Sequence, residues 1–390
     1  MVSWNWKTRS HRPIGLDIGS NSIKMLQLAV NGGHFSVLAA DKVRIDPNIN
    51  GDWSERRRFV ITSIQDMLAH HPFRGRNVVS CLPNEKLKIT SLRISGTDNN
   101  EIEQVLKKEV SYRFGLDPEK DSINYLPAGS VKHGDEIKNE LILFAAQNEA
   151  IRSHLNMLEE AQLRPVAIDT IPCALFRNFE RSARRHDEKE TTVVFVDVGM
   201  QYTTVVFGRR GEINFIKQIP IGMLKFNEQI ASKLGIGLNE AETLRNKLRP
   251  QTRFTTLPGE DETDAAEDTP NHAAFDLGTR QLVTDAIDST AEELAKEISL
   301  CFRYYTVTFR GKRIEKAIFA GGGSYENILL NVLRRQLTVE IEIAQPMRGF
   351  DIANVQLDCD RRSPLCEWAV AVGLGLKGYR PAGGGENERN

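Results

Sequence analysis

The sequence predicts an α/β protein in which one unit is built twice, with a small β-α-β-β-α subdomain inserted into the first copy. The duplication follows from a pattern that occurs at DIGSNSIKMLQL (17–28) and again at DVGMQYTTVVFG (197–208). Each copy is an apolar strand ending in Asp, then x-Gly, a short polar turn and a returning strand. A repeat at a spacing of 180 residues indicates a duplicated domain rather than a solenoid. Between the copies, residues 84–163 follow a strand and helix pattern of their own.

The composition argues against several classes of protein. The 51 Lys and Arg residues balance 52 Asp and Glu residues, whereas nucleic-acid binders usually carry a basic excess. No apolar run reaches about 18 residues, so no transmembrane helix is expected. The five cysteines are scattered without CxxC or Cys/His clusters, which argues against a disulfide scaffold or a zinc module. A length of 390 residues suggests two or three domains, in a reduced and cytoplasmic protein.

Five apolar or alternating runs predict the strands of the first unit: IGLDI (14–18), SIKMLQLAV (22–30), HFSVLAA (34–40), NVVSCLP (77–83) and RPVAID (164–169). A Gly-Gly pair supplies a hairpin turn after the second run, and Pro83 stops the fourth. Apolar residues near one face predict a helix over 55–70. The unit is therefore expected to occupy residues 13–83 and 164–188, with a C-terminal helix at 364–378.

The inserted subdomain is expected over residues 84–163. The strand KLKITSLRI leads into a helix, EIEQVLKKEVSYRF, whose apolar residues form one inward-facing stripe: Ile102, Val105, Leu106 and Val110. LDPEKDSINYLPAG, the strand NELILFAAQ and a helix from 149 to 162 complete the β-α-β-β-α order.

The second unit is expected at residues 189–225 and 313–363, with a further subdomain at 226–312. The run TTVVFVDVG (191–199) is continuously apolar, as is typical of a strand covered on both faces, and it leads into a hairpin. A long helix is predicted over about 280–309. The acidic segment 250–278 contains few large apolar residues and is expected to be a mobile surface loop, and the tail 379–390 is expected to be disordered.

Three glycine turns follow apolar strands: Asp17-Ile18-Gly19-Ser20, Asp197-Val198-Gly199-Met200 and Gly321-Gly322-Gly323-Ser324. Such a turn lets backbone N–H groups approach a phosphate without obstruction by a Cβ atom, and the third turn also leads into a helix N-terminus. The aspartates of the first two turns can hold Mg²⁺, directly or through water. Any one of these three turns, taken alone, is more often an ordinary tight turn. The duplicated pair together with GGGS predicts a nucleotide clamp between the two units.

These three turns resemble the phosphate-1, phosphate-2 and adenosine motifs of the actin/Hsp70/sugar-kinase ATPases. More closely, residues 13–378 resemble the FtsA-related PilM family of type IV pilus assembly proteins, which is also described as competence-type. The likeness rests on IGLDIGSNSIKMLQL, CLPNEKLKITSLRI, EIEQVLKKEVSYRFGLDPEKDSINYLP, FVDVGMQYTTVVF, IEKAIFAGGGS and WAVAVGLGL. The first turn alone is weakly specific, whereas the whole series in this order is highly specific. The resemblance implies a duplicated actin-like, FtsA-like nucleotide-binding fold.

The resemblance also implies that ATP or ADP with Mg²⁺ binds between the units, with at most weak hydrolysis. It assigns the first phosphate loop to Gly19, Ser20, Asn21, Ser22 and Lys24. It assigns the second loop to Asp197, Gly199, Thr203 and Thr204, and the adenosine contact to Gly321, Gly322, Gly323 and Ser324. It places Mg²⁺ near Asp17 and Asp197, and the nucleoside near Glu242 and Arg245.

Three departures or ambiguities accompany these assignments. Arg245 stands where lysine is usual in the family. Met200 and Gln201 replace the small residues common in the second loop, which would crowd that side. Asp169 falls where actin-like ATPases orient the attacking water, so it is the candidate catalytic residue, but an Asp there could equally cap the following helix.

The resemblance further implies a cytoplasmic scaffold at the inner membrane. It would dock the cytoplasmic N-terminal peptide of a PilN-like membrane protein within the pilus assembly complex, in a groove between the first unit and the inserted subdomain. Self-association stays open, as does a role in DNA uptake or secretion. The alternatives are a sugar kinase, although no catalytic Asp beside a polar sugar pocket is found, and an FtsA-like division protein. Against the latter, the tail GYRPAGGGENERN has no amphipathic membrane helix.

Three further patterns are interpreted as structural. GLGLKG (373–378) satisfies G-x-G-x-x-G, but only 12 residues follow it, so no βαβ unit can form and a packed C-terminal helix is expected. His70-His71 is interpreted as a solvated pair at a helix end rather than a metal site. The basic runs RRR (56–58) and RRH (184–186) are interpreted as solvated faces, with contact to an anionic membrane as the lesser alternative.

Overall fold

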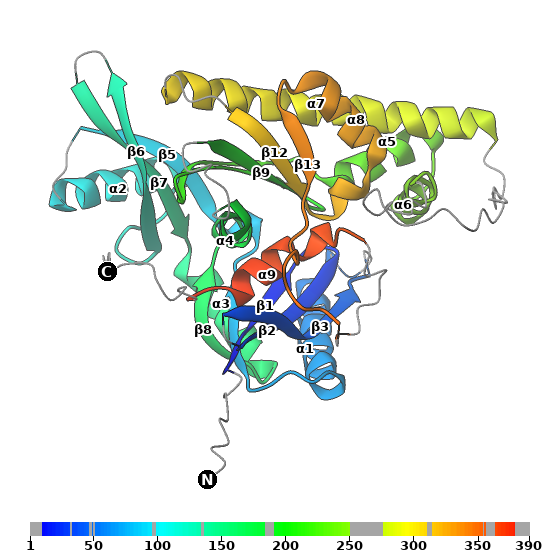
Figure 1. Cartoon of the computed structure of the whole chain (residues 1–390), viewed down its shortest axis with the longest axis horizontal. Helices are drawn as coiled ribbons and strands as arrows, with labels where there is room; N and C mark the ends of the chain where they lie inside the picture. The colour runs from blue at the N-terminus through cyan, green and yellow to red at the C-terminus, as the bar shows by residue number, and fades with distance from the viewer. Residues whose placement is uncertain are drawn as a thin grey trace, which may run out of the picture.

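The computed structural model describes residues 10–31, 33–46, 49, 51–95, 99–133, 136–183, 191–249, 276–309, 314–353, 355 and 363–378. Within these residues the chain forms two five-stranded sheets and one three-stranded sheet. Figure 1 shows the first sheet in blue below the second, with the three-stranded sheet to the left. No helix in the described part of the chain is long and apolar enough to cross a membrane.

The first sheet has the strand order β3-β2-β1-β4-β8. Its strands are β1 (Ser10–Ile18), β2 (Ser22–Asn31), β3 (His34–Arg44), β4 (Asn77–Cys81) and β8 (Arg164–Asp169). β1, β2 and β3 are antiparallel neighbours, whereas β1, β4 and β8 run parallel. Helices α1 (Trp53–His70) and α3 (Asn148–Glu160) pack on one face, where Ile64 and Leu158 join Ile14 in one core.

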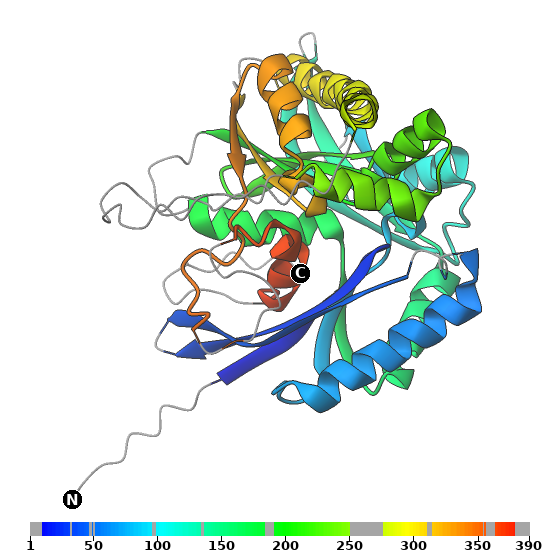
Figure 2. The same cartoon turned by 90° about the vertical axis from the view of Figure 1, so that its right-hand side faces the viewer.

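The other face of the first sheet is covered by α4 (Ile171–Ala183) and by the C-terminal helix α9 (Ala369–Gly375), which follows a 3₁₀ turn at Cys366–Trp368. Figure 2 shows α9 in red on the opposite side of the strands from α1. A Cβ atom on Gly373 would lie 1.9 Å from the Ala174 carbonyl oxygen, and one on Gly15 would lie 2.2 Å from that of Ala371. The glycines of GLGLKG therefore serve close helix packing, which confirms the structural interpretation of that motif.

The second sheet repeats the plan of the first, with the order β11-β10-β9-β12-β13. Its strands are β9 (Thr192–Val198), β10 (Thr203–Arg209), β11 (Glu212–Ile219), β12 (Ile314–Ala320) and β13 (Glu340–Ile343). The first three in sequence are antiparallel neighbours and β9, β12 and β13 are parallel, as in the first sheet. The duplication predicted from the two Asp-x-Gly patterns is therefore present at the level of strand order and direction.

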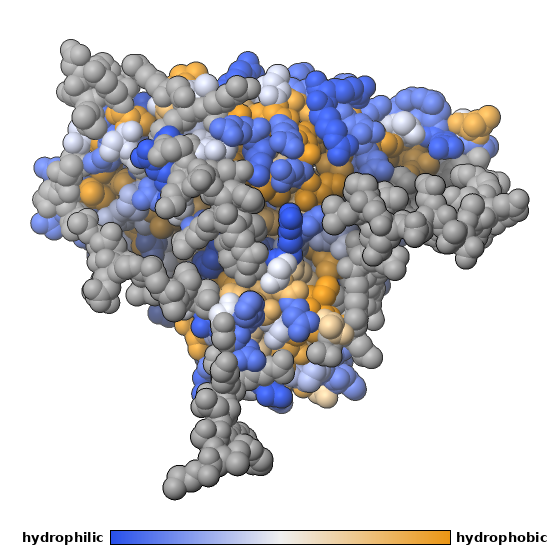
Figure 3. All heavy atoms as spheres, viewed as in Figure 1, coloured by the Kyte–Doolittle hydropathy of each residue, from blue (hydrophilic) through white to orange (hydrophobic). Residues whose placement is uncertain are grey.

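Four helices pack on the second sheet or on one another: α5 (Met223–Leu234), α6 (Leu238–Lys247), α7 (Leu277–Thr308) and α8 (Asn327–Gln336). Figure 3 shows hydrophilic side chains along the outer side of α7, with hydrophobic side chains between it and the sheet below. Asp276 caps α7 by accepting hydrogen bonds from the N–H groups of Gly278 and Thr279. The last residues of the predicted acidic loop therefore begin this helix. The rest of that loop, 250–275, and the tail 379–390 lie outside the described residues.

The inserted sheet consists of β5 (Lys88–Ile94), β6 (Ser122–His133) and β7 (Glu136–Ala146), in the order β5-β7-β6, with α2 (Asn99–Phe114) on one face. The predicted stripe on α2 is buried at Ile102, Leu106 and Val110, but Val105 is 37% exposed, so that part of the prediction was wrong. The other face packs on the second sheet, and Asn214 Nδ2 donates to the Ala128 carbonyl at 3.1 Å. The predicted domain boundaries stay predictions.

Candidate functional site

The two Asp-x-Gly turns have the same backbone hydrogen bond. The Gly19 N–H donates to the Ser22 carbonyl at 3.0 Å, and the Gly199 N–H donates to the Tyr202 carbonyl at 3.0 Å. Both turns end the first strand of their unit and begin the antiparallel partner. The repeated sequence pattern thus produces a repeated turn.

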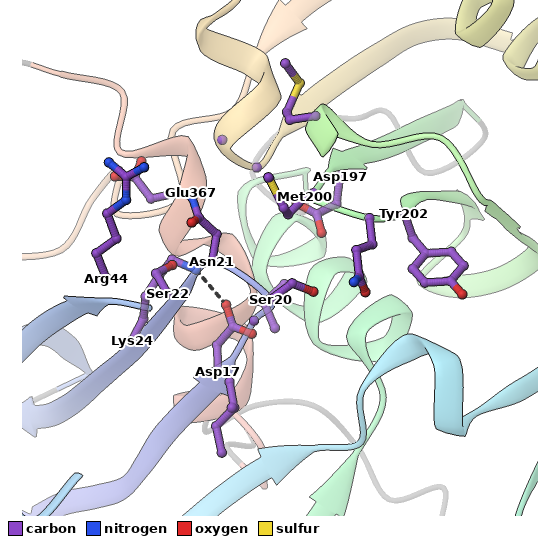
Figure 4. A pocket seen from close by; sticks show the side chains of 18 of the residues that line it. Asp17, Ser20, Asn21, Ser22, Lys24, Arg44, Asp197, Met200, Tyr202 and Glu367 are labelled. Atoms are coloured by element: carbon purple, nitrogen blue, oxygen red, sulfur yellow. Dashed lines mark hydrogen bonds and ion pairs between the residues drawn. The ribbon is translucent and has the colours of Figure 1, made fainter. Parts of the chain in front are cut away.

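The turns meet at a cavity of about 410 Å³ between the first and second sheets, which we call the central cavity. This volume lies within the range of about 300–1,000 Å³ that small-molecule sites usually have. In Figure 4, Asp17, Ser20 and Asn21 approach it from the first sheet, while Asp197, Met200 and Tyr202 approach it from the second. The predicted residues that line it are Asp17, Gly19, Ser20, Asn21, Ser22, Lys24, Asp197, Gly199, Glu242, Arg245, Gly321 and Gly322.

Two predicted threonines do not line the central cavity. Thr203 is fully buried and its hydroxyl donates to the Ile221 carbonyl at 2.7 Å. Thr204 is also fully buried, and its hydroxyl accepts from Asn84 Nδ2 at 3.4 Å. Both side chains hold the second sheet to its neighbours, so the structure gives them no direct place at the cavity.

Only two of the four residues predicted for the third turn lie at the central cavity. Gly321 and Gly322 line the central cavity, but Gly323 and Ser324 do not. The Ser324 hydroxyl is buried and donates to the Ala320 carbonyl at 2.7 Å. A Cβ atom on Gly323 would lie 2.3 Å from the side chain of Val198, so this glycine permits close packing. A 3₁₀ turn, Gly322–Tyr325, separates the glycines from α8.

Asp17 and Lys24 form a buried ion pair at the cavity. Nζ of Lys24 lies 2.9 Å from Oδ2 of Asp17, and both side chains are 9% exposed. Burial lowers the pKa of Lys24, but the charge and hydrogen bond of Asp17 outweigh this effect and leave that pKa raised. Lys24 is therefore a fixed positive charge beside the first turn.

Asp197 is the corresponding carboxylate of the second unit, and it has no such partner. Within the described part of the chain it makes no hydrogen bond or ion pair. Burial, and secondarily repulsion from Asp17, raise its pKa to about 6. A Cβ atom on Gly321, whose φ is 81°, would lie 2.5 Å from Oδ1 of Asp197. The open space before this carboxylate depends on that glycine.

Two predicted nucleoside contacts make ion pairs inside the protein. Oε1 of Glu242 lies 2.8 Å from Arg44, so α6 is joined to the end of β3 across the cavity. Arg245 is 2% exposed, pairs with Glu326 and donates from Nε to Asn227 Oδ1 at 2.8 Å. Burial lowers the pKa of Arg245, although Glu326 opposes the shift.

Asp169, the candidate catalytic residue, does not line the central cavity. Its Oδ2 atom lies 2.8 Å from Arg177 and 3.2 Å from Lys377. The first turn of α4 is instead capped by Thr170, whose hydroxyl accepts from the Cys173 N–H at 3.3 Å. The structure therefore places Asp169 in a buried ionic cluster behind the site and supports neither of the two predicted roles.

Several lining residues were missed by sequence reasoning: Lys42, Pro83, Asn84, Glu85, Arg249, Tyr325 and Glu367. They come from elements far apart in the chain and carry no shared motif. The Tyr325 hydroxyl donates to Glu367 Oε2 at 2.5 Å, and Lys42 donates to Oε1 at 3.1 Å. Burial raises the pKa of Glu367, but Lys42 and Tyr325 outweigh it and leave that pKa lowered.

The interpretation of RRR as a solvated face was wrong for Arg56, which is held against the first turn. Nη2 of Arg56 donates to the Gly19 carbonyl at 2.9 Å, which fastens α1 to the first turn. Arg57 makes a bidentate ion pair with Glu160, in which Nη1 donates to Oε2 and Nη2 to Oε1, each at 2.7 Å. Of the histidine pair, His71 Nε2 lies 3.2 Å from Asp41 Oδ2.

A second cavity lies behind the first turn, between α1, α3 and the segment 82–86, and we call it the side cavity. Its volume is about 410 Å³. It shares five wall residues with the central cavity: Ile18, Gly19, Ser20, Pro83 and Glu85. Trp53, Val60 and Met157 give it an apolar part. An adjoining hollow adds Glu119, Lys120 and Asp121 beside Arg57.

The central cavity has the donors and space for a phosphorylated ligand with a metal ion. No group of three or more His, Cys, Asp or Glu side chains in the described residues could hold a metal by itself. Mg²⁺ commonly keeps several waters and binds through one or two carboxylates together with phosphate oxygens. Asp17 and Asp197 fit that requirement, and Lys24 adds a positive charge.

Comparison with known proteins shows which family and which solved structures this chain resembles. A family model described as type IV pilus assembly protein PilM matches residues 15–253 and 265–379. A solved PilM-PilN type IV pilus biogenesis complex is 22% identical, covers 95% of this chain and 99% of that chain, and gives a TM-score of 0.73. Ethanolamine utilization protein EutJ from Carboxydothermus hydrogenoformans is 12% identical, with 94% and 89% covered and a TM-score of 0.50. These likenesses confirm the predicted actin-like fold class.

Proposed function

This chain belongs to the PilM family of type IV pilus assembly proteins, and on that premise we propose that it is an actin-like scaffold with two binding sites. The central cavity binds ATP or ADP with Mg²⁺. The side cavity binds the cytoplasmic N-terminal peptide of a PilN-like inner-membrane protein, which holds the scaffold at the cytoplasmic side of that membrane. The observation that carries the nucleotide part is the pair of equivalent turns, each preceded by an aspartate that lines one and the same cavity.

The residues of the central cavity suit the parts of a nucleotide. The glycines of the first two turns line the cavity without a Cβ atom, which lets phosphate oxygens approach the turn backbone, and Lys24 adds a positive charge on the first side. Asp197 is partly buried without an ion-pair partner in the described residues, so a metal ion there would relieve the cost of its charge. Bound Mg²⁺ supplies neutralisation of the phosphate charge.

The arrangement supports a protein that holds nucleotide rather than one that hydrolyses it rapidly. Asp169, the one candidate for orienting a water, is engaged by Arg177 and Lys377 outside the central cavity. Glu85 lines the cavity and stays a carboxylate that a water could contact there. We therefore propose at most weak hydrolysis.

The side cavity suits an extended peptide with apolar anchors and a basic residue. Trp53 is 58% exposed at its rim, and Val60, Leu82 and Met157 form apolar wall. Charged side chains of both signs line the two hollows: Glu85, Glu149, Arg56, Arg57 and Lys86 in the side cavity, and Glu119, Asp121, Lys120 and Arg152 in the adjoining one. Apolar pockets give such a peptide affinity, and the wall residues Glu85 and Glu149 are the partners that we propose for its basic side chain.

Titration calorimetry tests the nucleotide part. The full chain should bind ATP and ADP in the presence of Mg²⁺, and the Asp17→Asn, Asp197→Asn double variant should bind them at least about tenfold more weakly, a loss of about 1.4 kcal/mol. Unchanged affinity in the double variant would exclude the central cavity as the nucleotide site.

Fluorescence anisotropy with a labelled PilN-like N-terminal peptide tests the docking part. Deleting 84–163 would be uninformative, because α3 lies in that range and Leu158 is fully buried in the core of the first sheet. Trp53→Ala and Ala150→Trp, which respectively remove an anchor and fill the side cavity, should each weaken binding about tenfold or more. Tyr112→Ala is the control, since Tyr112 is 90% exposed on α2 and outside the side cavity. Equal affinities in all four proteins would contradict docking there.

A further inference from the structure

The first turn is held from behind by the side chain of Arg56. Its Nη2 atom donates to the Gly19 carbonyl at 2.9 Å, and its Nη1 atom donates to the Ser20 carbonyl at 3.5 Å. Gly19 and Ser20 line both the central cavity and the side cavity, whereas Arg56 lines only the side cavity of the two. The turn therefore separates the two cavities, and the guanidinium group lies on the side away from the central one.

The second turn is held at the two equivalent carbonyls by a different group. The Met223 N–H donates to the Gly199 carbonyl at 3.0 Å, and the Leu224 N–H donates to the Met200 carbonyl at 2.8 Å. Met223 and Leu224 begin helix α5, whose N-cap is Gly222. A Cβ atom on Gly222 would lie 2.5 Å from the Met200 carbonyl oxygen, so the glycine permits this close approach. In the second unit a helix N-terminus therefore takes the place that a guanidinium group has in the first.

The two sets of contacts place a positive group at the same two carbonyls of each turn. Gly19 corresponds to Gly199, and Ser20 corresponds to Met200, in the repeated Asp-x-Gly pattern. A helix N-terminus carries a partial positive charge, and a guanidinium group carries a full one. Two turns whose side chains differ are therefore supported from behind in the same way.

Support of the carbonyls determines the direction of the N–H groups in the turn. In a trans peptide the C=O group and the following N–H group point in opposite directions. The carbonyls of Gly19 and Ser20 point toward Arg56, so the N–H groups of Ser20 and Asn21 point away from it, which is the side of the central cavity. Successive N–H groups on one side of a turn bind anions, and hydrogen bonds from a charged donor strengthen this polarity of the peptide groups.

We propose that Arg56 is a positioning residue for the phosphates of the nucleotide. Arg56 lies outside the central cavity, so it acts through the first turn rather than by contact with the ligand. It orients the peptide groups of that turn and adds a positive charge behind them, which preorganises the turn for phosphate oxygens. This role rests on the proposed nucleotide site and does not require a peptide in the side cavity. It concerns ligands that carry phosphates and spares the nucleoside.

Calorimetry of the full chain with ATP, ADP and adenosine, each in the presence of Mg²⁺, tests this role. Arg56→Gln should weaken the binding of ATP and ADP at least about fivefold and leave the affinity for adenosine within about twofold of its original value. Arg56→Lys keeps the charge but cannot donate to two carbonyls in the same geometry, so its loss should be smaller and confined to the same two ligands. Arg58→Gln is the matched control, because it removes the same charge from an exposed residue of α1 and should bind all three ligands like the unaltered chain.

The three ligands separate this role from a purely structural one. If Arg56 only stabilised the fold, Arg56→Gln would weaken the binding of adenosine as much as that of ATP, and this result would overturn the proposal. An affinity for ATP that Arg56→Gln leaves unchanged would overturn it too, while the nucleotide site would stand. An unaltered chain that binds neither ATP nor ADP would overturn the nucleotide site and this role together. Thermal denaturation verifies that each variant is folded, and Arg56→Lys gives the comparison where Arg56→Gln is not.

Discussion

Lys24 donates a hydrogen bond to Asp17 over 2.9 Å at the central cavity, and the equivalent position opposite Asp197 is held by Thr204. The two units therefore share a turn but differ in charge. The first carboxylate is neutralised by a fixed ammonium group, whereas the second is partly buried without such a partner in the described residues. We therefore expect Asp197 to make the stability of the ligand-free protein depend on pH.

Replacing Asp197 by asparagine should stabilise the ligand-free protein at pH 8 while weakening nucleotide binding at least about tenfold. Burial and the charge of Asp17 raise the pKa of Asp197 from 3.8 to about 6, so ionisation costs the folded state about 3 kcal/mol. The cost builds up as pH rises from about 4 to 6 and is complete above the folded pKa. Urea denaturation at pH 4 and pH 8 measures it.

The stabilisation by Asp197→Asn should fall to about 0.5 kcal/mol at pH 4 and nearly vanish at about pH 3, because the carboxyl, with pKa values of 3.8 unfolded and about 6 folded, becomes protonated in both states only there. Asp66→Asn is the control, since Asp66 is exposed on α1. An equal change in stability at both pH values would show that the charge of Asp197 is not what destabilises the ligand-free protein.

Arg245→Lys should destabilise the protein although lysine is the residue expected here from the family resemblance. Arg245 donates from Nε to Asn227 while its Nη1 pairs with Glu326, and a single ammonium group cannot reproduce both contacts in that geometry. Leaving one buried partner unsatisfied costs about 1–3 kcal/mol. Thermal denaturation of this variant, beside Arg334→Lys at an exposed position of α8, measures the loss. No loss would mean that the arginine is interchangeable there.

The parts of the site that could be predicted are those encoded by a short local pattern. A strand ending in Asp-x-Gly determines its own turn, so Gly19 and Gly199 could be placed from sequence. Side-chain direction was harder, because it depends on strand register and on neighbours from other elements. Thr203 and Thr204 follow the second turn closely in sequence, yet one bonds to Ile221 and the other to Asn84.

Residues that reach the cavity from distant elements could not be predicted at all. Glu85 belongs to the start of the inserted segment, and Glu367 lies beside the C-terminal helix. The ion pair of Arg57 with Glu160 likewise spans two helices that become neighbours only when the first sheet forms. No periodicity or local spacing relates such residues.

His154 should make stability depend on pH in the direction opposite to Asp197. Burial lowers the pKa of His154 to about 4, and its Nε2 lies 3.1 Å from the Ser80 hydroxyl. Between about pH 4 and 6.5 the unfolded chain therefore binds a proton that the folded chain does not bind. The contribution of His154 to the free energy of unfolding is complete above about pH 6.5 and is lost as pH falls toward 4. His154→Gln should reduce this decline relative to the unaltered chain.

Urea denaturation between pH 4 and pH 7 measures the effect of His154→Gln. His34→Gln, at an exposed position of β3, is the matched control and should leave the acid dependence as it was. Because Asp197 acts in the opposite direction over much of the same range, the comparison is best repeated in the Asp197→Asn background. An unaltered slope in that background would contradict a neutral, buried His154.

Gly321→Ala should disable the central cavity, whereas Gly322→Ala should be tolerated. Gly321 has φ 81° and ψ 171°, a combination that residues with a Cβ atom rarely adopt, and the added atom would lie 2.5 Å from both Asp197 Oδ1 and the Val198 carbonyl. We expect a loss of about 2 kcal/mol or more in stability and at least about tenfold weaker nucleotide binding. At Gly322 a Cβ atom would meet no heavy atom of the protein within 4 Å, so stability should stay near its original value. Calorimetry and urea denaturation of the two variants give the comparison. Equal behaviour of the pair would mean that the third turn has a different conformation when nucleotide is bound.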